Sequence, residues 1–266
     1  MPRDEMCGMM FGAEKLLYAQ LCKLKREYGL QGIKAEFEAE GSSFRDIMRL
    51  RRLTSSAGVK LHLKIGGVEA LRDIKDAIEI GVDGIIAPMV ESVFGAKKFY
   101  ESIQRFYKDT PIHTTLNIET KTAIDNLEEI LAYASGKFAN INIGRSDLSA
   151  SFLAPEITPE SEQIYTILSR VIHDIQDFPL TFGIGGGLSR ISIENLNTIY
   201  APLKSYINQL ETRKVILPTQ SFCDKADAIK EALKFEELYI LSKKEFSDLH
   251  IDSEIARLPE LQRRML

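Results

Sequence analysis

The sequence predicts an α/β fold, a single (β/α)₈ TIM barrel over residues 1–266 with an extra N-terminal helix and a long C-terminal helix. Two observations favour this fold class. Short apolar segments alternate with amphipathic helical segments at roughly 25–30 residues per unit, which is typical of a parallel sheet with helical crossovers. The chain also has 266 residues, close to the roughly 250 of a typical closed barrel. An open, doubly wound sheet is the alternative.

The predicted elements follow one another without linkers, repeats or low-complexity tracts. Leucines at helical spacing predict a helix over residues 13–28, within an N-terminal extension (1–30), and another over 225–243, within a C-terminal segment (224–266). Seven strands are expected, all parallel, with an ambiguous eighth over 213–217. They cover residues 33–38, 59–65, 84–89, 112–118, 139–143, 180–184 and 205–210. The intervening helices are expected over 44–56, 68–80, 93–107, 122–133, 160–176 and 191–200.

Composition excludes several classes of protein. The net charge is −4 with scattered Lys and Arg, so the chain has no basic footprint for nucleic acid or an anionic membrane. No window approaches the roughly 18 apolar residues that span a bilayer, and no signal peptide is expected. Cys7, Cys22 and Cys223 lack metal-site spacing and indicate reduced thiols, so we expect a cytoplasmic protein.

Two carboxylates stand at the ends of consecutive predicted strands. The strand over 112–118 ends at Glu119, and the strand over 139–143 ends just before Asp147. The helix between them makes a βαβ unit, whose parallel strands lie near each other with their carboxyl ends at one edge. Such a pair, without a His or Cys ligand set, suits a hard divalent cation such as Mg²⁺. Alternatively, each acid only complements a helix dipole.

Side chains alternate along a strand, which assigns the polar residues to one face of each predicted strand. The apolar faces should meet the helices, so the polar faces should line the barrel lumen. Glu36 and Glu38 then lie at a strand end beside a cationic centre, where a carboxylate can act as general base. The polar residues expected in the lumen are Lys34, Glu36, Glu38, His62, Lys64, His113, Thr115, Asn117, Glu119, Asn140 and Asn142.

Three segments occur in order along the chain: IAPMVES at 86–92, NIET at 117–120 and IGRSDLSAS at 143–151. Together they resemble the HpcH/HpaI aldolase and citrate lyase β-subunit family. The resemblance implies a pyruvate/phosphoenolpyruvate-type barrel that makes or breaks carbon–carbon bonds next to a 2-oxo acid or acyl thioester. It also implies that Glu119 and Asp147 hold Mg²⁺ or Mn²⁺, and that Asn117 contacts the metal or the substrate.

The chain departs from that family at two places. Where the family carries an Arg that clamps the substrate carboxylate, this chain has Lys64, which keeps the charge but loses the bidentate geometry. Where the aldolases carry a proton-transfer His, this chain has Ala39. The proton would then move through Glu36, Glu38 or metal-bound water, with His62 as a further candidate.

A glycine-rich stretch, GIGGGLS at 183–189, ends a predicted strand and opens a helix. The N–H groups of Gly185 and Gly186 could bind an anionic part of the substrate there. Alternatively, the stretch is a tight turn that needs positive φ. Arg213, at the last strand end, adds a cation near the same rim.

These residues predict a metal-dependent carbon–carbon lyase or aldolase that acts through the enolate of a 2-oxo acid or related carboxylate. Its cofactor would be Mg²⁺ or Mn²⁺. The assigned residues are Glu119 and Asp147 for the metal, Lys64, Asn117, Arg145, Gly185, Gly186 and Arg213 for the substrate, and Glu36, Glu38 and Lys64 for catalysis.

Two alternatives remain open. A Schiff-base aldolase could use Lys64 or Lys34, although a lysine between carboxylates tends to stay charged. A barrel that has lost the chemistry could serve as a binding or assembly subunit. The resemblance and the extra terminal helices also predict a homo-oligomer, a trimer or hexamer, without a nucleic-acid or membrane partner.

Overall fold

The computed structural model of the chain describes residues 10–108 and 110–265, and Cys7 lies outside them. No helix in these two ranges combines the length and the apolar composition needed to cross a bilayer. The strands are β1 (Gly32–Glu36), β2 (Leu61–Lys64), β3 (Gly84–Ala87), β4 (His113–Ile118), β5 (Asn140–Gly144), β6 (Thr181–Gly185), β7 (Gln209–Glu211) and β8 (Val215–Pro218). The helices are α2 (Gly12–Tyr28), α3 (Phe44–Ala57), α4 (Leu71–Ile80), α5 (Val93–Tyr107), α6 (Lys121–Asp125), α7 (Leu127–Ala134), α8 (Arg145–Ala150), α9 (Glu162–Ile175), α10 (Arg190–Asn197), α11 (Thr219–Asp224), α12 (Ala228–Ile255), α13 (Leu258–Arg264) and the 3₁₀ helix η1 (Ala201–Tyr206).

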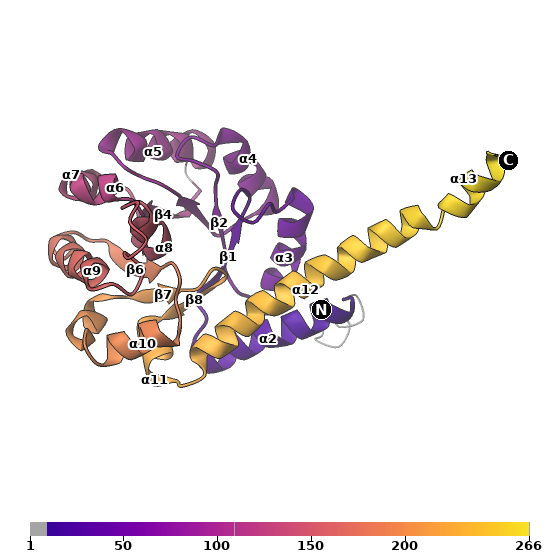
Figure 1. Cartoon of the computed structure of the whole chain (residues 1–266). Coiled ribbons are helices and arrows are strands. Elements are labelled where there is room, and N and C mark those ends of the chain that lie inside the picture. The colour runs from indigo at the N-terminus through magenta and orange to yellow at the C-terminus, as the bar shows by residue number, and fades with distance from the viewer. Residues whose placement is uncertain (1–9, 109, 266) are drawn as a thin grey trace.

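The eight strands close into a barrel in the order β1 to β8, which confirms the predicted barrel and excludes the open sheet. Strands β1 to β7 pair in parallel, for example with Leu116 opposite Ile141. The helices from α3 to α10 surround the strands (Figure 1). The carboxyl ends of these seven strands therefore meet at one rim, the place where barrel enzymes carry their sites.

The last strand departs from the expected all-parallel arrangement. β8 is antiparallel to both β7 and β1, with Leu210 opposite Leu217. Only residues 212–214 connect β7 to β8, whereas a crossover between parallel strands needs about a dozen residues or more. The Thr212 N–H donates to the Val215 carbonyl over 3.0 Å and closes this turn. The β7–β8 connection therefore adds no helix to the outer ring.

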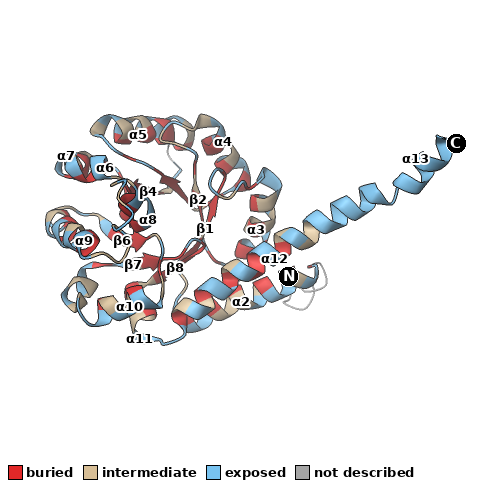
Figure 2. Cartoon of the chain, viewed as in Figure 1, coloured by how far each residue is buried: buried red, intermediate tan, exposed pale blue. Residues whose placement is uncertain are grey.

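On β1, β2, β4 and β5 an apolar face alternates with a polar one, as predicted. On β2, Leu61 and Leu63 are completely buried in the core, whereas Lys64 lines the lumen. Burial of each such leucine contributes about 1.5–3 kcal/mol. Buried residues gather on the strands and on the inner sides of the helices (Figure 2). The core thus lies between barrel and helices and leaves the lumen polar.

The predicted N-terminal and C-terminal helices are both present and pack on each other. The Gln20 side chain donates to the Glu231 carboxylate over 2.8 Å, and the Ala13 N–H donates to the Glu245 carboxylate over 2.9 Å. The first half of α12 also buries Phe235 against the core. Beyond this contact, α12 and α13 project away from the barrel (Figure 1).

Candidate active site

A cavity of about 230 Å³ opens at the carboxyl ends of the barrel strands. All seven parallel strands, and several of the loops that follow them, contribute residues to it. It brings together most of the residues predicted for metal and substrate binding, while Glu38 and Arg145 lie outside it. Its lining includes Lys34, Glu36, Lys64, Asn117, Glu119, Asn142, Asp147, Gly185, Gly186, Glu211 and Arg213.

Glu119 follows β4 and is 1% exposed. The Met89 N–H donates to its Oε1 over 3.0 Å, and the Asn117 amide donates to its Oε2 over 3.0 Å. A Cβ on Gly144 would lie 2.4 Å from Glu119 Oε2, so glycine is required beside this carboxylate. Burial raises the pKa of Glu119, and the charge of Asp147 raises it further.

Asp147, on α8, lines the same cavity as Glu119. It comes there because β4 and β5 are parallel neighbours, with Ile118 opposite Ile143. Among the described residues, no group of three or more His, Cys, Asp or Glu side chains could hold a metal ion. Mg²⁺ does not need such a group, because it binds through one or two carboxylates and keeps several waters. The two carboxylates therefore fit a hard divalent cation.

A buried ion pair lies on the side of the cavity formed by β1 and β7. Lys34 Nζ lies 2.8 Å from Glu211 Oε2, and the Gln209 amide donates to Glu211 Oε1 over 2.8 Å. Burial lowers the pKa of Lys34, but Glu211 outweighs this effect and the pKa is raised, so Lys34 stays charged. Arg213 is exposed at the cavity mouth. Glu211 is not among the residues predicted from the sequence, because the predicted strand ends at residue 210. Its alternation with Gln209 was the available signal.

The structure separates the two candidate bases. Glu36 ends β1, is 7% exposed and lines the cavity. Glu38 stands two residues later, outside the cavity and exposed to solvent. Its side chain packs beside Gly66, where an added Cβ would lie 2.8 Å from Glu38 Cγ. Only Glu36 is therefore placed to reach a group bound in the lumen.

A second buried ion pair, between Glu40 and Lys214, joins the loop after β1 to the β7–β8 turn. Lys214 Nζ also lies 4.3 Å from the centre of the Tyr239 ring of α12, a cation–π contact. Burial lowers the pKa of Lys214 against the opposing effect of Glu40. The pair links the cavity rim to the C-terminal helix. Local sequence patterns do not predict this pair, because its partners are 174 residues apart.

Arg145 does not reach the cavity that it was predicted to serve. It is 2% exposed, and its guanidinium donates to the Glu160 carboxylate over 2.9 Å, the Gly186 carbonyl over 3.1 Å and the Ser192 hydroxyl over 3.1 Å. Burial raises the pKa of Glu160, but Arg145 and several hydrogen bonds lower it overall. Because these partners occupy the guanidinium, Arg145 holds the glycine-rich loop in place instead of contacting substrate.

His62 lies deeper in the barrel than Lys64 and does not line the cavity. Its ring packs edge-on against His113 with 5.2 Å between centroids. A Cβ on Gly84 would lie 2.3 Å from His62 Nδ1, so glycine makes room for the ring. Burial lowers the pKa of His62 to about 4, with repulsion from His113 adding to the effect. His62 is thus a neutral spacer and does not replace the absent family histidine.

The glycine-rich loop lines the cavity as a close-packed turn. Gly186 has φ 80°, and a Cβ there would lie 2.5 Å from the Arg145 backbone nitrogen. At the start of α10, the Ser192 N–H donates to the Ser189 hydroxyl, and the Ser189 N–H donates back to the Ser192 hydroxyl. These bonds occupy two amides at the start of α10. The positive φ and close packing of Gly186 agree with the tight-turn interpretation, and Gly185 and Gly186 both line the cavity.

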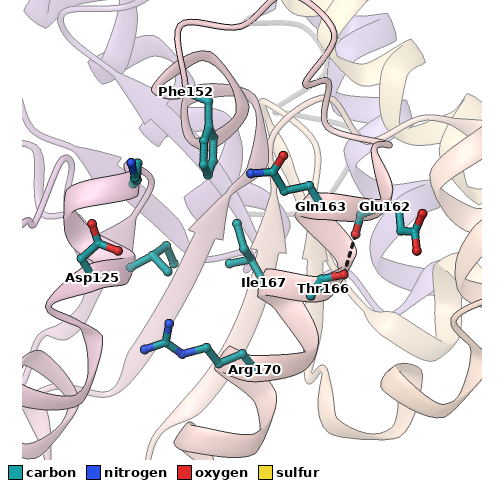
Figure 3. Close-up of a pocket in the computed structure, with 9 residues that line it drawn as sticks. Asp125, Phe152, Glu162, Gln163, Thr166, Ile167 and Arg170 are labelled. Carbon is teal, nitrogen blue, oxygen red and sulfur yellow. Dashed lines mark hydrogen bonds between the residues drawn. The ribbon is translucent and has the colours of Figure 1, made fainter.

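A second cavity, of about 520 Å³, lies between α6 and α9 outside the barrel (Figure 3). Asp125, Glu162 and Arg170 line it together with the apolar Phe152 and Ile167. It contains none of the residues predicted for metal, substrate or catalysis. The barrel cavity is therefore the candidate active site.

Comparisons with known proteins agree with this fold. The family model described as HpcH/HpaI aldolase/citrate lyase matches residues 49–180. A search of curated proteins gave no match. Similar solved structures include an HpcH/HpaI aldolase from Desulfitobacterium hafniense DCB-2 (TM-score 0.57, 18% identity, covering 73% of this chain and 82% of that one). They also include the citrate synthase SbnG (TM-score 0.59, 14% identity, 88% and 89%) and an HpcH/HpaI aldolase/citrate lyase family protein from Burkholderia cenocepacia J2315 (TM-score 0.53, 17% identity, 69% and 78%). The chain belongs to the HpcH/HpaI aldolase/citrate lyase family.

Proposed function

We propose that the protein is a divalent-metal-dependent carbon–carbon lyase or aldolase that acts through the enolate of a small 2-oxo acid. The observation that carries this proposal is the meeting of Glu119, Asp147 and Lys64 in one cavity at the barrel rim. Membership of a family of carbon–carbon lyases and aldolases supports the same reaction class.

Glu119 and Asp147 would hold Mg²⁺ or Mn²⁺. When bound, the cation would polarise the substrate carbonyl and offset the negative charge that develops on it. The protein's own contribution is orientation, because the Met89 N–H and the Asn117 amide each bind one oxygen of Glu119. Hydrogen bonds of this kind hold a ligating carboxylate in one geometry.

Lys64 would bind the substrate carboxylate. Its ammonium nitrogen lies 3.7 Å from Glu119 Oε1, and its side chain is 18% exposed. A lysine offers a compact charge with rotatable donors, so it can follow a carboxylate without the fixed fork of an arginine. The same charge would stabilise the negative charge of the transition state.

Glu36 would move the proton. It lines the cavity from β1, beside the charged Lys34 and away from bulk solvent. A positioned carboxylate can take a proton from the substrate and return it. The exposed Glu38 lacks this access.

The cavity favours a small, singly charged substrate. Its volume of about 230 Å³ is below the roughly 300–1,000 Å³ of sites for larger ligands. Among the described residues that line it, four carboxylates face three cationic side chains. The lining therefore carries one net negative charge. A divalent cation and one monocarboxylate would together neutralise it, which supports a 2-oxo acid with a single carboxylate as the substrate.

Both alternatives remain to be tested. Schiff-base chemistry needs an uncharged lysine amine, and the ion pair with Glu211 works against this at Lys34. The second alternative is a barrel that only binds ligands or assembles with partners. It is based on two departures from the family, Lys64 in place of an Arg and Ala39 in place of a His.

Metal analysis combined with a pyruvate-release assay over pairs of 2-oxo acids and aldehydes tests the proposal. We expect Glu119→Gln and Asp147→Asn to lose divalent-cation affinity while their unfolding transitions stay cooperative. Asp125→Asn, in the cavity between α6 and α9, is the matched control and should keep both metal and activity.

Three other outcomes would decide against the proposal. Activity that survives chelation in the wild type would remove the metal role. A borohydride-trapped adduct on a lumen lysine in metal-free protein would establish the Schiff-base mechanism. Metal binding without turnover of any substrate pair would favour the binding subunit.

A further inference from the structure

Strand β1 loses its regular partner on one side before it reaches the cavity. β1 pairs with β2 as far as Glu36, which lies opposite Lys64. On the other side its pairing with β8 stops at Ile33, which lies opposite Val215. The stretch that carries Lys34 and Glu36 into the cavity is therefore held by regular pairing on one side only. A group that takes part in a reaction must be held in place, so this strand end needs another support.

Lys214 supplies this support with both its main chain and its side chain. The Lys34 N–H donates to the Lys214 carbonyl over 2.8 Å. In an antiparallel ladder the return bond would come from the Lys214 N–H, but that group donates to the Thr212 hydroxyl over 3.4 Å. The Lys214 ammonium replaces it and donates to the Lys34 carbonyl over 3.3 Å. The side chain thus extends the support of β1 by one pair toward the rim.

The Lys214 ammonium is enclosed on its remaining sides, and the side chain is only 2% exposed. It forms an ion pair with Glu40 in the loop after β1. The ring of Tyr239, on the part of α12 that packs beside β8, has its centre 4.3 Å from the ammonium nitrogen. A carbonyl, a carboxylate and an aromatic ring suit the three N–H donors of an ammonium. Lys214 therefore joins β1, the loop after it and α12 at one point.

The segments that Lys214 joins carry one side of the active-site cavity. β1 contributes Lys34 and Glu36, and the turn before Lys214 contributes Thr212 and Arg213. Lys214 itself stays outside the cavity, so it can affect a substrate only through these neighbours. The proposed metal ligands follow β4 and β5, on the opposite side of the closed barrel. A change at Lys214 should thus disturb the proton-transfer side of the cavity and spare the metal side.

We infer that Lys214 is a positioning residue, whose ammonium holds the rim end of β1 and so fixes Glu36 in the cavity. The kinetic consequence rests on the proposed function, in which Glu36 moves the proton, whereas the support of β1 does not depend on it. Glu40 balances the charge that this role places inside the protein. A methionine at this position would fill a similar volume but would not donate to the Lys34 carbonyl.

The main test variant combines Lys214→Met with Glu40→Gln, because removing the lysine alone would leave a buried carboxylate without its cation. Glu40→Gln alone is a milder variant that releases only the loop after β1. Lys214→Arg is the conservative variant, since its guanidinium keeps both the charge and the donors. The matched control, Arg51→Met with Asp83→Asn, removes an ion pair at the other end of the barrel, where the Leu61 N–H donates to Asp83.

Hydrogen–deuterium exchange of the full-length protein tests the support of β1 and requires no turnover. In the double variant of Lys214 and Glu40, a peptide that covers residues 33–43 should exchange roughly tenfold faster than in the wild type, because this stretch opens more easily. Glu40→Gln should give a smaller increase, and Lys214→Arg should give none. A peptide that covers β4 (113–119) should be unchanged in these three variants. A wild-type rate in 33–43, or an equal increase in both peptides, would overturn the inference.

Steady-state kinetics test whether this support serves the reaction. Misplacement of a reacting group by about 1 Å costs about 100-fold in rate, so we expect kcat of the double variant to fall roughly 10- to 100-fold. The dissociation constant for Mn²⁺ should stay unchanged, which separates loss of position from general damage. The control pair and Lys214→Arg should keep most of the wild-type kcat. A wild-type kcat in the double variant would reduce Lys214 to a structural role.

Failure of the proposed function and failure of the Lys214 role give different results. If the wild type turns over no substrate pair, the proposed function is wrong, and the exchange rates alone decide whether Lys214 holds β1. Turnover in the wild type, together with unchanged exchange in the double variant, would retain the proposed function and reject the role of Lys214.

Discussion

The ammonium nitrogen of Lys64 lies 3.7 Å from Oε1 of Glu119, the buried carboxylate at the end of β4. This is too long for a strong hydrogen bond, so Lys64 is attracted to the carboxylate but free to turn toward a ligand. The two residues come from β2 and β4, with one strand between them in the barrel. This relation places a cation next to the proposed metal ligand.

Replacing Lys64 should mainly weaken substrate binding and transition-state stabilisation. Loss of one charge-assisted contact costs about 1.5–3 kcal/mol, so we expect Lys64→Ala to lower kcat/KM roughly 10- to 150-fold. Lys64→Arg should recover part of this loss because it keeps the charge. Steady-state kinetics provide the measurement. Equal inactivity of both variants, with an imine trapped on Lys64, would indicate nucleophilic catalysis instead.

Glu36, which ends β1, and Glu38, in the loop that follows, should differ sharply in their kinetic effect. Glu36→Gln removes the carboxylate that faces the cavity, and loss of general-base catalysis lowers kcat by about 10²–10⁴-fold. Glu38→Gln is the matched control, because its exposed side chain lies outside the cavity. It should change kcat by no more than about twofold. If Glu38→Gln has the larger effect, the base has been misassigned.

His62 should make the stability of the fold depend on pH. Its pKa is about 4 in the folded chain and about 6.5 when unfolded, so the unfolded state binds more protons between these values. The contribution of neutral His62 to the free energy of unfolding is then fully present above about pH 6.5. The free energy of unfolding falls by about 3 kcal/mol as the pH drops toward 4. Urea unfolding at several pH values measures this slope. His62→Gln should flatten it, and an unchanged slope would exclude His62 as its source.

Arg145 should matter for stability because it holds the glycine-rich loop from inside the protein. Arg145→Met leaves Glu160 without its cation and should cost about 3 kcal/mol of unfolding free energy. The control Arg170→Met breaks the exposed pair with Asp174 and should cost less than about 1 kcal/mol. Adding Glu160→Gln to Arg145→Met should recover part of the loss. Equal costs at the two sites would contradict the positioning role.

The sequence by itself determined the barrel and the meeting of two carboxylates, Glu119 and Asp147, at its rim. Alternation of polar and apolar residues within each strand decides which side faces the helices, so Leu61, Leu63 and Lys64 are placed correctly by local pattern. The βαβ unit likewise brings Glu119 and Asp147 to one edge, because parallel strands joined by a helix share that edge.

Only the tertiary structure decided features that depend on partners distant in the chain. Whether Glu36 or Glu38 faces the cavity depends on where β1 ends and its loop turns. Arg145 binds Glu160 and Ser192 because α8 directs it toward the next loop, which no local periodicity encodes. The direction of β8 and the ion pair of Glu40 with Lys214 both result from long-range packing. Periodicity assigns a side chain to a face, but only packing selects the groups that it meets there.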